Sequence, residues 1–447
     1  MTKDQLLSPF QKFVRLQSFS GILLMATTII ALVWANSAFS ESYYDFWHYE
    51  LGFVTEDFEL RKPLILWVND GLMAIFFFLI GLEIKREFMI GELNSTKKIM
   101  FPLVGAIGGI ALPVLMYIIL NQNPETLKGW GIPMATDIAF SLAIIKVLGN
   151  RVPLSLKIFL TAFAIVDDLG AVLVIAIFYS GSLNFILLGS ALALLAVIYY
   201  LSYKGFYSEM LIIVSGFVVW LLFLKAGLHP TLAGILMAFA VPVRQKISTS
   251  EFTEQLDVIV ANIKQTRVLQ KPVLSTDQLH LIDDLEDWAE KYQSPLQHFE
   301  HALHDWVAYL IIPIFALANA GVALNGSADL ETALVVNLMI CLILGKSIGI
   351  SLLVFLAKKF KFIEVPKDIT NKHIIGVSFL AGIGFTMAIF IASLAFATSP
   401  EYVDSAKIGI LLGSFISALI GFIILRSKTT KGSFNHNPLE MEQEASK

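Results

Sequence analysis

Long apolar segments follow one another along almost the whole chain, and they constrain the fold more than any other feature of the sequence. They lie near residues 17–36, 64–84, 99–120, 129–148, 154–180, 183–201, 206–225, 228–243, 305–323, 333–357, 373–397 and 405–426. A transmembrane helix needs about 20 mainly apolar residues, so the pattern predicts about twelve membrane-spanning helices. Only 15% of the residues are charged, against about 25% in soluble domains. We therefore expect an all-α polytopic membrane protein.

The basic residues are concentrated in one of the two sets of loops between these spans. That set holds Lys85, Arg86, Lys97, Lys98, Lys146, Arg151, Lys157, Lys204, Arg244, Lys246, Lys358, Lys359, Lys361, Lys367 and Lys372. The alternate loops hold little beyond Arg61, Lys62, Lys128, Lys225 and Lys407. Because cytoplasmic loops carry the excess of lysine and arginine, we expect both termini in the cytoplasm, including a tail at 428–447. Spans one to eight then occupy residues 1–244, and spans nine to twelve occupy 305–427.

Two groups of three spans have opposite predicted directions, which is typical of transporters built from inverted repeats. Spans three to five begin at the cytoplasmic side, and spans ten to twelve begin at the external side. The middle span of each group is interrupted, by Pro133 in "GIPMATDIAF" and by Gly382 and Gly384 in "LAGIGFTMAI". Proline removes a backbone donor, while glycine tolerates non-helical backbone. Interruptions at corresponding places in two halves indicate a binding site formed by discontinuous helices.

Two segments lie outside the spans. Residues 43–62 are rich in aromatic residues with partial alternation, which favours an external β-hairpin or interfacial loop. Residues 245–304 form a long charged connection on the cytoplasmic side. One amphipathic helix is expected in it, within "STDQLHLIDDLEDWAEKY". Its apolar face would hold Leu279, Ile282, Leu285, Trp288 or Ala289, and Tyr292.

Two adjacent acids lie at the middle of the span that begins near Ser155. Asp167 and Asp168 are each about twelve residues from its ends, which places them roughly 18 Å from both edges, near the bilayer midplane. An ionised aspartate there costs about 2.5–3.5 kcal/mol. The pair therefore indicates a functional site rather than a structural one.

The ionisable groups inside the predicted membrane are few, and they suggest ion exchange. They are Asp137, Asp167, Asp168 and Lys346. Neighbouring residues on a helix point about 100° apart, so one acid can face Lys346 while the other faces water. Two close carboxylates cannot both ionise cheaply, so their protonation is coupled. A hard cation such as Na⁺ or Li⁺ wants the same oxygens, and competition between proton and cation at one site with alternating access is antiport.

Structural interpretations stay open for several of these residues. Lys346 could fasten two helices through an Asp–Lys pair, and Asp137 could complement the N-terminal dipole of a half-helix. Thr136 could satisfy only its own backbone. The cluster of Glu83, Arg86 and Glu87 could be an ordinary set of interfacial charges. A buried cap would explain His229 as well as a proton sensor would.

At these residues the sequence closely resembles the NhaA-type bacterial sodium/proton antiporter family. The resemblance lies in "WANS", "VNDGLMAIFFFLIGLEIKREF", "PMATDIAFSLAI", "LTAFAIVDDLGAVLVIAIFYS", "GLHPTLAG", "WVAYLIIPIFALANAGV", "GKSIGI" and "GVSFLAGIGFTMAIFIASLAF". It implies twelve helices in which the interrupted fourth and eleventh spans cross. It also implies electrogenic exchange of two protons inward for one Na⁺ or Li⁺ outward, in the bacterial inner membrane, faster at alkaline pH.

The resemblance also implies roles for individual residues. Asp168 would be the principal ligand of the transported Na⁺, with Asp167 as proton carrier and Thr136 at the cation site. Lys346 would pair with Asp167 until the cation displaces it, and Asp137 and Lys346 would offset the dipoles of the broken helices. The residues implied in the pH response are Glu83, Arg86, His229 and Glu300, with Arg86 pairing with Glu300. The segment 43–62 resembles the family's homodimer contact, whereas the connection at 245–300 is longer than is usual in the family.

Other function classes fit the sequence less well. "VDDLG" and "GIGF" lack the arrangement of acids that an intramembrane aspartyl protease needs, and "DDLGA" stops short of the DDxxD of a prenyltransferase. We therefore expect a transporter that is not an enzyme and has no cofactor. With a net charge of −4 and no long basic patch, nucleic acid is not an expected partner. The alternative is a sodium-coupled symporter of an organic solute with similar inverted repeats.

Overall fold

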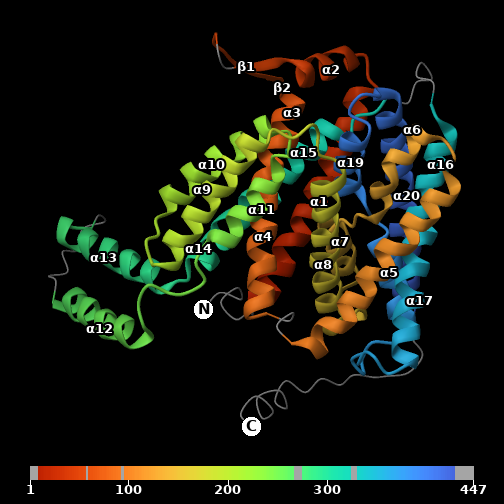
Figure 1. Cartoon of the computed structure of the whole chain (residues 1–447). Helices are drawn as coiled ribbons and strands as arrows, with labels where there is room; N and C mark the ends of the chain where they lie inside the picture. The colour runs from red at the N-terminus through yellow and green to blue at the C-terminus, as the bar shows by residue number, and fades with distance from the viewer. Residues whose placement is uncertain (1–8, 57–58, 92–94, 266–273, 324–329, 428–447) are drawn as a thin grey trace.

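The computed structural model shows a bundle of helices that run between two ends of the molecule (Figure 1). It describes residues 9–56, 59–91, 95–265, 274–323 and 330–427. The predicted cytoplasmic tail, 428–447, lies outside these residues. A short β-hairpin covers one end, the hairpin end, and a pair of helices projects at the other, the loop end. Among the described residues these two strands are the only sheet.

Within the described residues, eight helices are long and apolar enough to cross a membrane alone, and three bent pairs bring the number to as many as eleven. The single helices are α3–η2–α4 (Leu64–Met89), α5 (Thr96–Leu120), α8 (Leu154–Phe178), α9 (Phe185–Tyr203), α10 (Glu209–Ala226), α14–η6–α15 (Pro295–Asn319), α16–η7–α17 (Thr332–Lys359) and α20 (Pro400–Arg426). The chain is therefore an all-helical, multi-pass membrane protein.

Two of the three bent pairs contain the breaks that position the site. Helix α1 (Pro9–Ala35) meets α2 (Ser40–His48) at 111°. The segment α6–η4 (Pro124–Met134) meets α7 (Ile138–Leu148) at 44°, and α18 (Asn371–Ala381) meets α19 (Phe385–Ala395) at 42°. The last two pairs break at the predicted places, beside Pro133 and at Gly382–Gly384.

Helix α11 (Thr231–Ala240) is shorter than the segment predicted at 228–243. It begins directly after Pro230 and ends before Val241, whose backbone is extended. A residue that precedes a proline is pushed out of the helical region, and Pro242 follows Val241. The two prolines therefore limit this helix to ten residues.

Glycines bring α5 and α17 into backbone contact at the centre of the bundle. A Cβ added to Gly108 would lie 2.2 Å from the carbonyl oxygen of Gly349, and one added to Gly349 would lie 2.1 Å from that of Gly108. Neither position accepts a side chain without separating the helices. Because α17 begins at Lys346, this contact fixes the helix that carries the buried lysine.

The hairpin is shorter than predicted, because part of the segment 43–62 is helical. Strands β1 (Glu50–Val54) and β2 (Glu59–Pro63) pair antiparallel with Gly52 opposite Arg61. Residues 43–48 belong to α2 instead. There Tyr43 and Trp47, one helical turn apart, are buried together. The Tyr43 hydroxyl also donates to the carbonyl oxygen of Leu317 at 2.8 Å, so aromatic packing against the bundle overrides the partial alternation.

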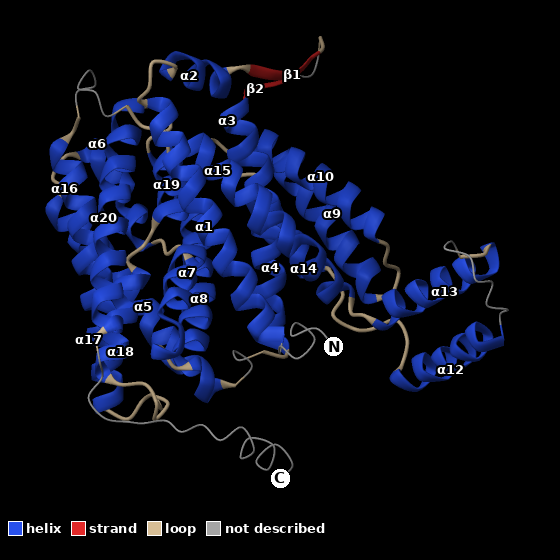
Figure 2. Cartoon of the chain, turned by 180° about the vertical axis from the view of Figure 1, so that it is seen from behind, coloured by secondary structure: helices blue, strands red, loops and turns tan. Residues whose placement is uncertain are grey.

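The connection 245–304 contains two amphipathic helices, not the single one predicted, and its last ten residues belong to the next span. Helices α12 (Thr249–Gln265) and α13 (Thr276–Tyr292) lie side by side and project from the bundle (Figures 1 and 2). Phe252 of α12 stacks on Tyr292 of α13 with ring centroids 4.3 Å apart. Pro295 then starts α14 at its first turn. Apolar residues at helical spacing also occur in α12, which is why it folds as a partner for α13.

Candidate functional site

The two broken helices touch where each changes direction. Helix α7 begins after Asp137 and α19 begins after Gly384. The backbone N–H of Asp137 donates to the carbonyl oxygen of Ile383 at 2.6 Å, which joins the two breaks directly. Chain segments that lie about 245 residues apart are thereby brought together inside the bundle.

Asp137 caps the N-termini of both half-helices. Its Oδ1 accepts from the backbone N–H of Phe140 in α7 at 3.1 Å. Its Oδ2 accepts from both the backbone N–H, at 3.1 Å, and the hydroxyl, at 2.6 Å, of Thr386 in α19. A negative charge stabilises a helix N-terminus because the N–H groups there lack partners within the helix. One carboxylate therefore serves two half-helices.

The carbonyl end of α18 meets hydroxyl groups and a positive charge. The Thr136 hydroxyl donates to the carbonyl oxygen of Ala381 at 3.0 Å, and the Ser141 hydroxyl donates to that of Leu380 at 2.9 Å. The Lys346 ammonium donates in turn to the Thr136 hydroxyl. A cation is favourable near the C-terminal end of a helix, so Lys346 complements one dipole end and Asp137 the opposite ends.

Lys346 and Asp167 form an ion pair at the centre of the bundle. The Lys346 Nζ lies 2.8 Å from Asp167 Oδ2, and both side chains are 0% exposed. Asp168 is also buried and has no such partner among the described residues; its Oδ1, like Asp167 Oδ1, accepts no hydrogen bond. The two acids thus differ in their surroundings, since Asp167 faces a lysine and Asp168 faces a cavity.

A cavity of about 50 Å³ lies beside Asp168. Its polar lining consists of Glu83, Thr136, Asp137, Asp168, His304 and Thr386. A space of this size holds an ion with one or two waters. Hard cations prefer carboxylate, hydroxyl, carbonyl and water oxygens. No group of three or more His, Cys, Asp or Glu side chains suited to a resident metal occurs in the described part of the chain, so a cation here would rely on the other oxygen types as well.

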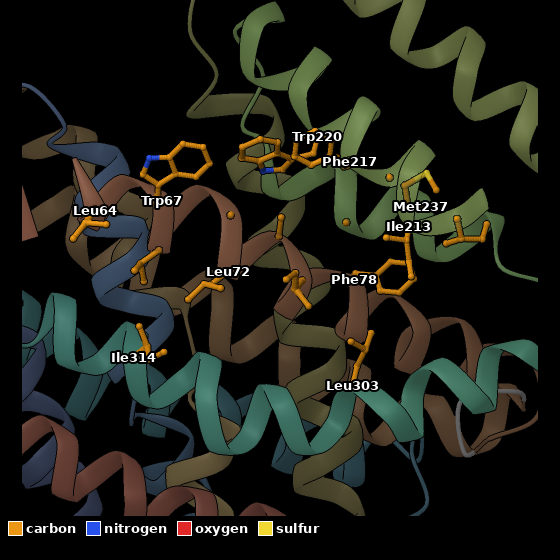
Figure 3. A pocket seen from close by; sticks show the side chains of 18 of the residues that line it. Leu64, Trp67, Leu72, Phe78, Ile213, Phe217, Trp220, Met237, Leu303 and Ile314 are labelled. Atoms are coloured by element: carbon orange, nitrogen blue, oxygen red, sulfur yellow. The ribbon is translucent and has the colours of Figure 1, made fainter. Parts of the chain in front are cut away.

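A second cavity is much larger and contains none of these acids. It measures about 940 Å³ and lies among α4, α10, α11 and α14–α15 (Figure 3). Its labelled lining is apolar: Leu64, Trp67, Leu72, Phe78, Ile213, Phe217, Trp220, Met237, Leu303 and Ile314. With no charged lining residue, it offers no ligands for a cation.

Three of the four residues implied in the pH response lie together near the loop end. Arg86 Nε is 3.1 Å from Glu300 Oε2, and Arg86 Nη2 is 2.9 Å from Glu87 Oε1. Glu83, one turn earlier on α4, is buried and lines the small cavity. The structure therefore brings Arg86 and Glu300 into contact and connects this cluster with the cavity through Glu83.

His229 lies elsewhere, in the loop before α11. Its Nδ1 is 2.7 Å from the Thr231 hydroxyl, and its Nε2 is 3.9 Å from Asp70 Oδ1. Asp70 also pairs with Lys62 of β2 at 2.7 Å. Burial lowers the pKa of His229 to about 4, assisted by the charge of Lys62 and opposed by that of Asp70. Asp70 and Glu83 are separated by roughly 20 Å along the same helix, so His229 is remote from the Arg86 cluster.

Two polar residues of the site were not predicted as site residues. Thr386 follows the "GIG" of the second break, and its place as first polar residue after an interruption was a usable signal. His304 carried no such signal, because its sequence neighbours place it at the edge of a charged connection. Only the packing of α14 against α4 brings it to the cavity.

Comparisons with known proteins show the family to which the chain belongs. Residues 11–425 match the family model described as Na⁺/H⁺ antiporter 1. The chain is 46% identical to a Na⁺/H⁺ antiporter NhaA of Oleidesulfovibrio alaskensis over 95% of its own length and 94% of that protein. It is 42% identical to NhaA 1 of Saccharophagus degradans (94% and 92%) and 41% identical to NhaA of Helicobacter pylori strain 26695 (95% and 96%). The chain therefore belongs to the NhaA family of Na⁺/H⁺ antiporters.

Proposed function

We propose that this protein is an electrogenic antiporter that exports Na⁺ or Li⁺ across the bacterial inner membrane in exchange for protons. The site is the pair Asp167–Asp168 with Thr136. The observation that carries the proposal is the unequal pairing of the two acids: Asp167 has a buried lysine as counter-ion, whereas Asp168 has none within the part of the chain that the structure describes. Burying a carboxylate without a counter-ion is costly, so Asp168 takes up either a proton or a cation.

The coupling follows from competition for the same oxygens. A cation that enters the small cavity meets Asp168 first, because Asp168 lines that cavity. With Asp167 as a second ligand, the cation takes the place of the Lys346 ammonium, and Thr136 loses its lysine donor and can turn an oxygen lone pair to the cation. Protonation of the carboxylates reverses these steps. Only one kind of ion occupies the site at a time, which is what exchange requires.

We infer that the chain has twelve spans, which include α1 and α11, and two inverted repeats, which consist of α5 to α8 and of α16 to α20. In each, the middle span is broken, as α6–η4/α7 and as α18/α19, which supports a crossing of spans four and eleven. The distribution of lysine and arginine supports cytoplasmic termini and a cytoplasmic loop end.

The exposed hairpin supports a homodimer. All five residues of β1 are exposed, including Phe53 at 74% and Val54 at 61%. Apolar side chains on a free strand edge are typical of a surface that another chain covers. We infer that a second copy of the hairpin contributes to the dimer contact.

Four further residues are proposed to adjust the response to pH. Glu83, Arg86 and Glu300 connect the loop end with the small cavity, and His229 is the fourth, at the hairpin end.

An organic solute is a poorer fit to the small cavity beside Asp168, because about 50 Å³ leaves no room for more than an ion and water. This size favours ion exchange over the symport alternative.

The test uses the full chain reconstituted in proteoliposomes, with one dye for internal pH and one for membrane potential. Addition of Na⁺ should move protons in the opposite direction and move net charge, and Asp168→Asn should abolish both signals. Asp287→Asn, at an exposed aspartate of α13, is the matched control and should behave as the wild type. Normal Na⁺-driven proton movement in Asp168→Asn would refute the assignment of the site.

A further inference from the structure

The Lys346 ammonium has three N–H donors, and two hydrogen-bond acceptors contact it. They are Asp167 Oδ2 and the Thr136 hydroxyl. No third protein oxygen accepts from this group among the described residues. Instead, the Nζ lies over the ring of Phe163, 5.8 Å from its centroid. An ammonium within about 6 Å of an aromatic face is attracted by the negative charge on that face.

Phe163 is held rigidly in this position. It lies on α8 one turn before Asp167, so both side chains project from the same face of the helix. On its other side the ring fills a slot made by two glycines of α5. A Cβ added to Gly105 would lie 3.3 Å from Phe163 Cδ2, and one added to Gly109 would lie 3.2 Å from Phe163 Cζ. Since the ring is 1% exposed, it cannot withdraw from the lysine.

We propose that Phe163 is a positioning residue that holds the Lys346 ammonium against Asp167 and thereby sets the apparent affinity for the transported cation. The inference rests on the proposed function, since it assumes that the cation replaces Lys346 at Asp167. In the ion-free arrangement the ring stabilises the lysine where it competes with the cation. Loss of the ring weakens the competitor, so the cation should bind more tightly.

Few other groups can produce this effect. The charged groups close to Lys346 are Asp167 and Asp168 of α8. Helix α5 presents no charged side chain between Met100 and Leu120, only the phenol of Tyr117, and α18 presents none between Ile374 and Ala381. The thiol of Cys341 lies on the same continuous helix as Lys346, more than one turn away. Apart from the Thr136 hydroxyl, which belongs to the proposed cation site, the ring is therefore the contact of the ammonium that a substitution can remove without altering a charge.

The experiment measures Na⁺-dependent proton exchange in proteoliposomes for Phe163→Leu, with Phe159→Leu as the matched control. Phe159 lies one turn earlier on the same face, and the centroids of the Phe159 and Phe163 rings are 6.1 Å apart. The ring that lies under the Lys346 ammonium is that of Phe163, not that of Phe159. Phe163→Leu should lower the apparent KM for Na⁺ about fivefold, equivalent to ~1 kcal/mol. Phe159→Leu should leave the KM unchanged.

A second variant separates the ring's charge distribution from its packing. A ring-trifluorinated phenylalanine at position 163 keeps the shape of the residue and removes most of the negative charge on the ring face. It should lower the KM in the same direction as Phe163→Leu, even if Phe163→Leu proves unstable. A KM that is unchanged or raised in the fluorinated protein overturns the inference, while the wild type still exchanges ions. Absence of exchange in the wild type overturns the proposed function instead.

Discussion

Replacing Asp137 with alanine should destabilise the contact between the two broken helices. The substitution removes three hydrogen bonds at once, from Phe140 N–H, Thr386 N–H and the Thr386 hydroxyl. All three donors lose their acceptor; the two of Thr386 are buried and that of Phe140 is partly buried. The half-helices α7 and α19 both lose the negative charge at their N-termini, so the damage is shared by two elements.

The magnitude follows from these three bonds. A buried donor left without a partner costs about 1–3 kcal/mol, and hydrogen bonds to charged groups lie at the upper end. Removal of the buried charge itself returns part of this cost, so we expect a loss of about 5 kcal/mol in the free energy of unfolding. At about 2.1 cal/mol/K per residue, a chain of 447 residues should show a fall of about 5 °C in its thermal midpoint.

The assay is thermal unfolding of the purified protein, with two variants for comparison. Thr386→Val removes one of the three bonds and should cost roughly a third as much. Asp287→Ala changes a side chain that is 68% exposed and should leave the midpoint in place. If Asp137→Ala lowers the midpoint no further than Thr386→Val does, the carboxylate does not hold both half-helices, and the shared cap is wrong.

Three other perturbations have defined outcomes. Gly108→Val places atoms against the backbone of Gly349; it should lower the free energy of unfolding by at least about 3 kcal/mol and abolish exchange. Gly189→Val is the control, because a Cβ at this position meets nothing within 4 Å, and it should change neither the stability nor the exchange. Because burial lowers the pKa of His229 to about 4 in the folded protein, the unfolded chain takes up a proton first as the pH falls below about 6.5. The free energy of unfolding of the wild type should therefore decline between pH 6.5 and pH 4. His229→Gln should flatten this decline when thermal midpoints are measured across the same pH range. Replacing residues 249–292 with a short Gly/Ser linker should leave exchange intact while altering its pH profile; complete loss of folded protein on size exclusion would contradict this.

Much of the fold could be predicted because membrane spans are recognised from the length and the low polarity of their segments alone. The positions of the apolar segments and the two interruptions at Pro133 and at Gly382–Gly384 are read directly from local sequence. Prediction was weaker where packing decides. The helical part of 43–62 depends on Tyr43 reaching α15, and that contact joins residues 274 positions apart.

The residues of the site also fall into two groups, those that the sequence alone indicates and those that only the packing of helices brings to the site. An acid or a lysine in the middle of an apolar segment is conspicuous, so Asp137, Asp167, Asp168 and Lys346 could be singled out from the sequence. Thr386 had only its position directly after the second interruption as a signal, and His304 had none, because its sequence neighbours place it at the edge of a charged connection. Whether an Asp167–Lys346 contact forms depends on how α8 and α17 pack, and periodicity along one helix carries no information about that.

The ion pair between Asp167 and Lys346 has a consequence for how the protein is made. The two residues lie 179 positions apart in the chain. At about 5–20 residues per second of synthesis, α8 is complete roughly 10–40 s before α17 leaves the ribosome. During that interval the two acids enter the membrane without their counter-ion, at the cost that unpaired acids carry there. Before α17 is made, α8 must therefore be inserted with its acids protonated or shielded by neighbouring helices. The ion pair between Asp167 and Lys346 forms only after α17 has been inserted.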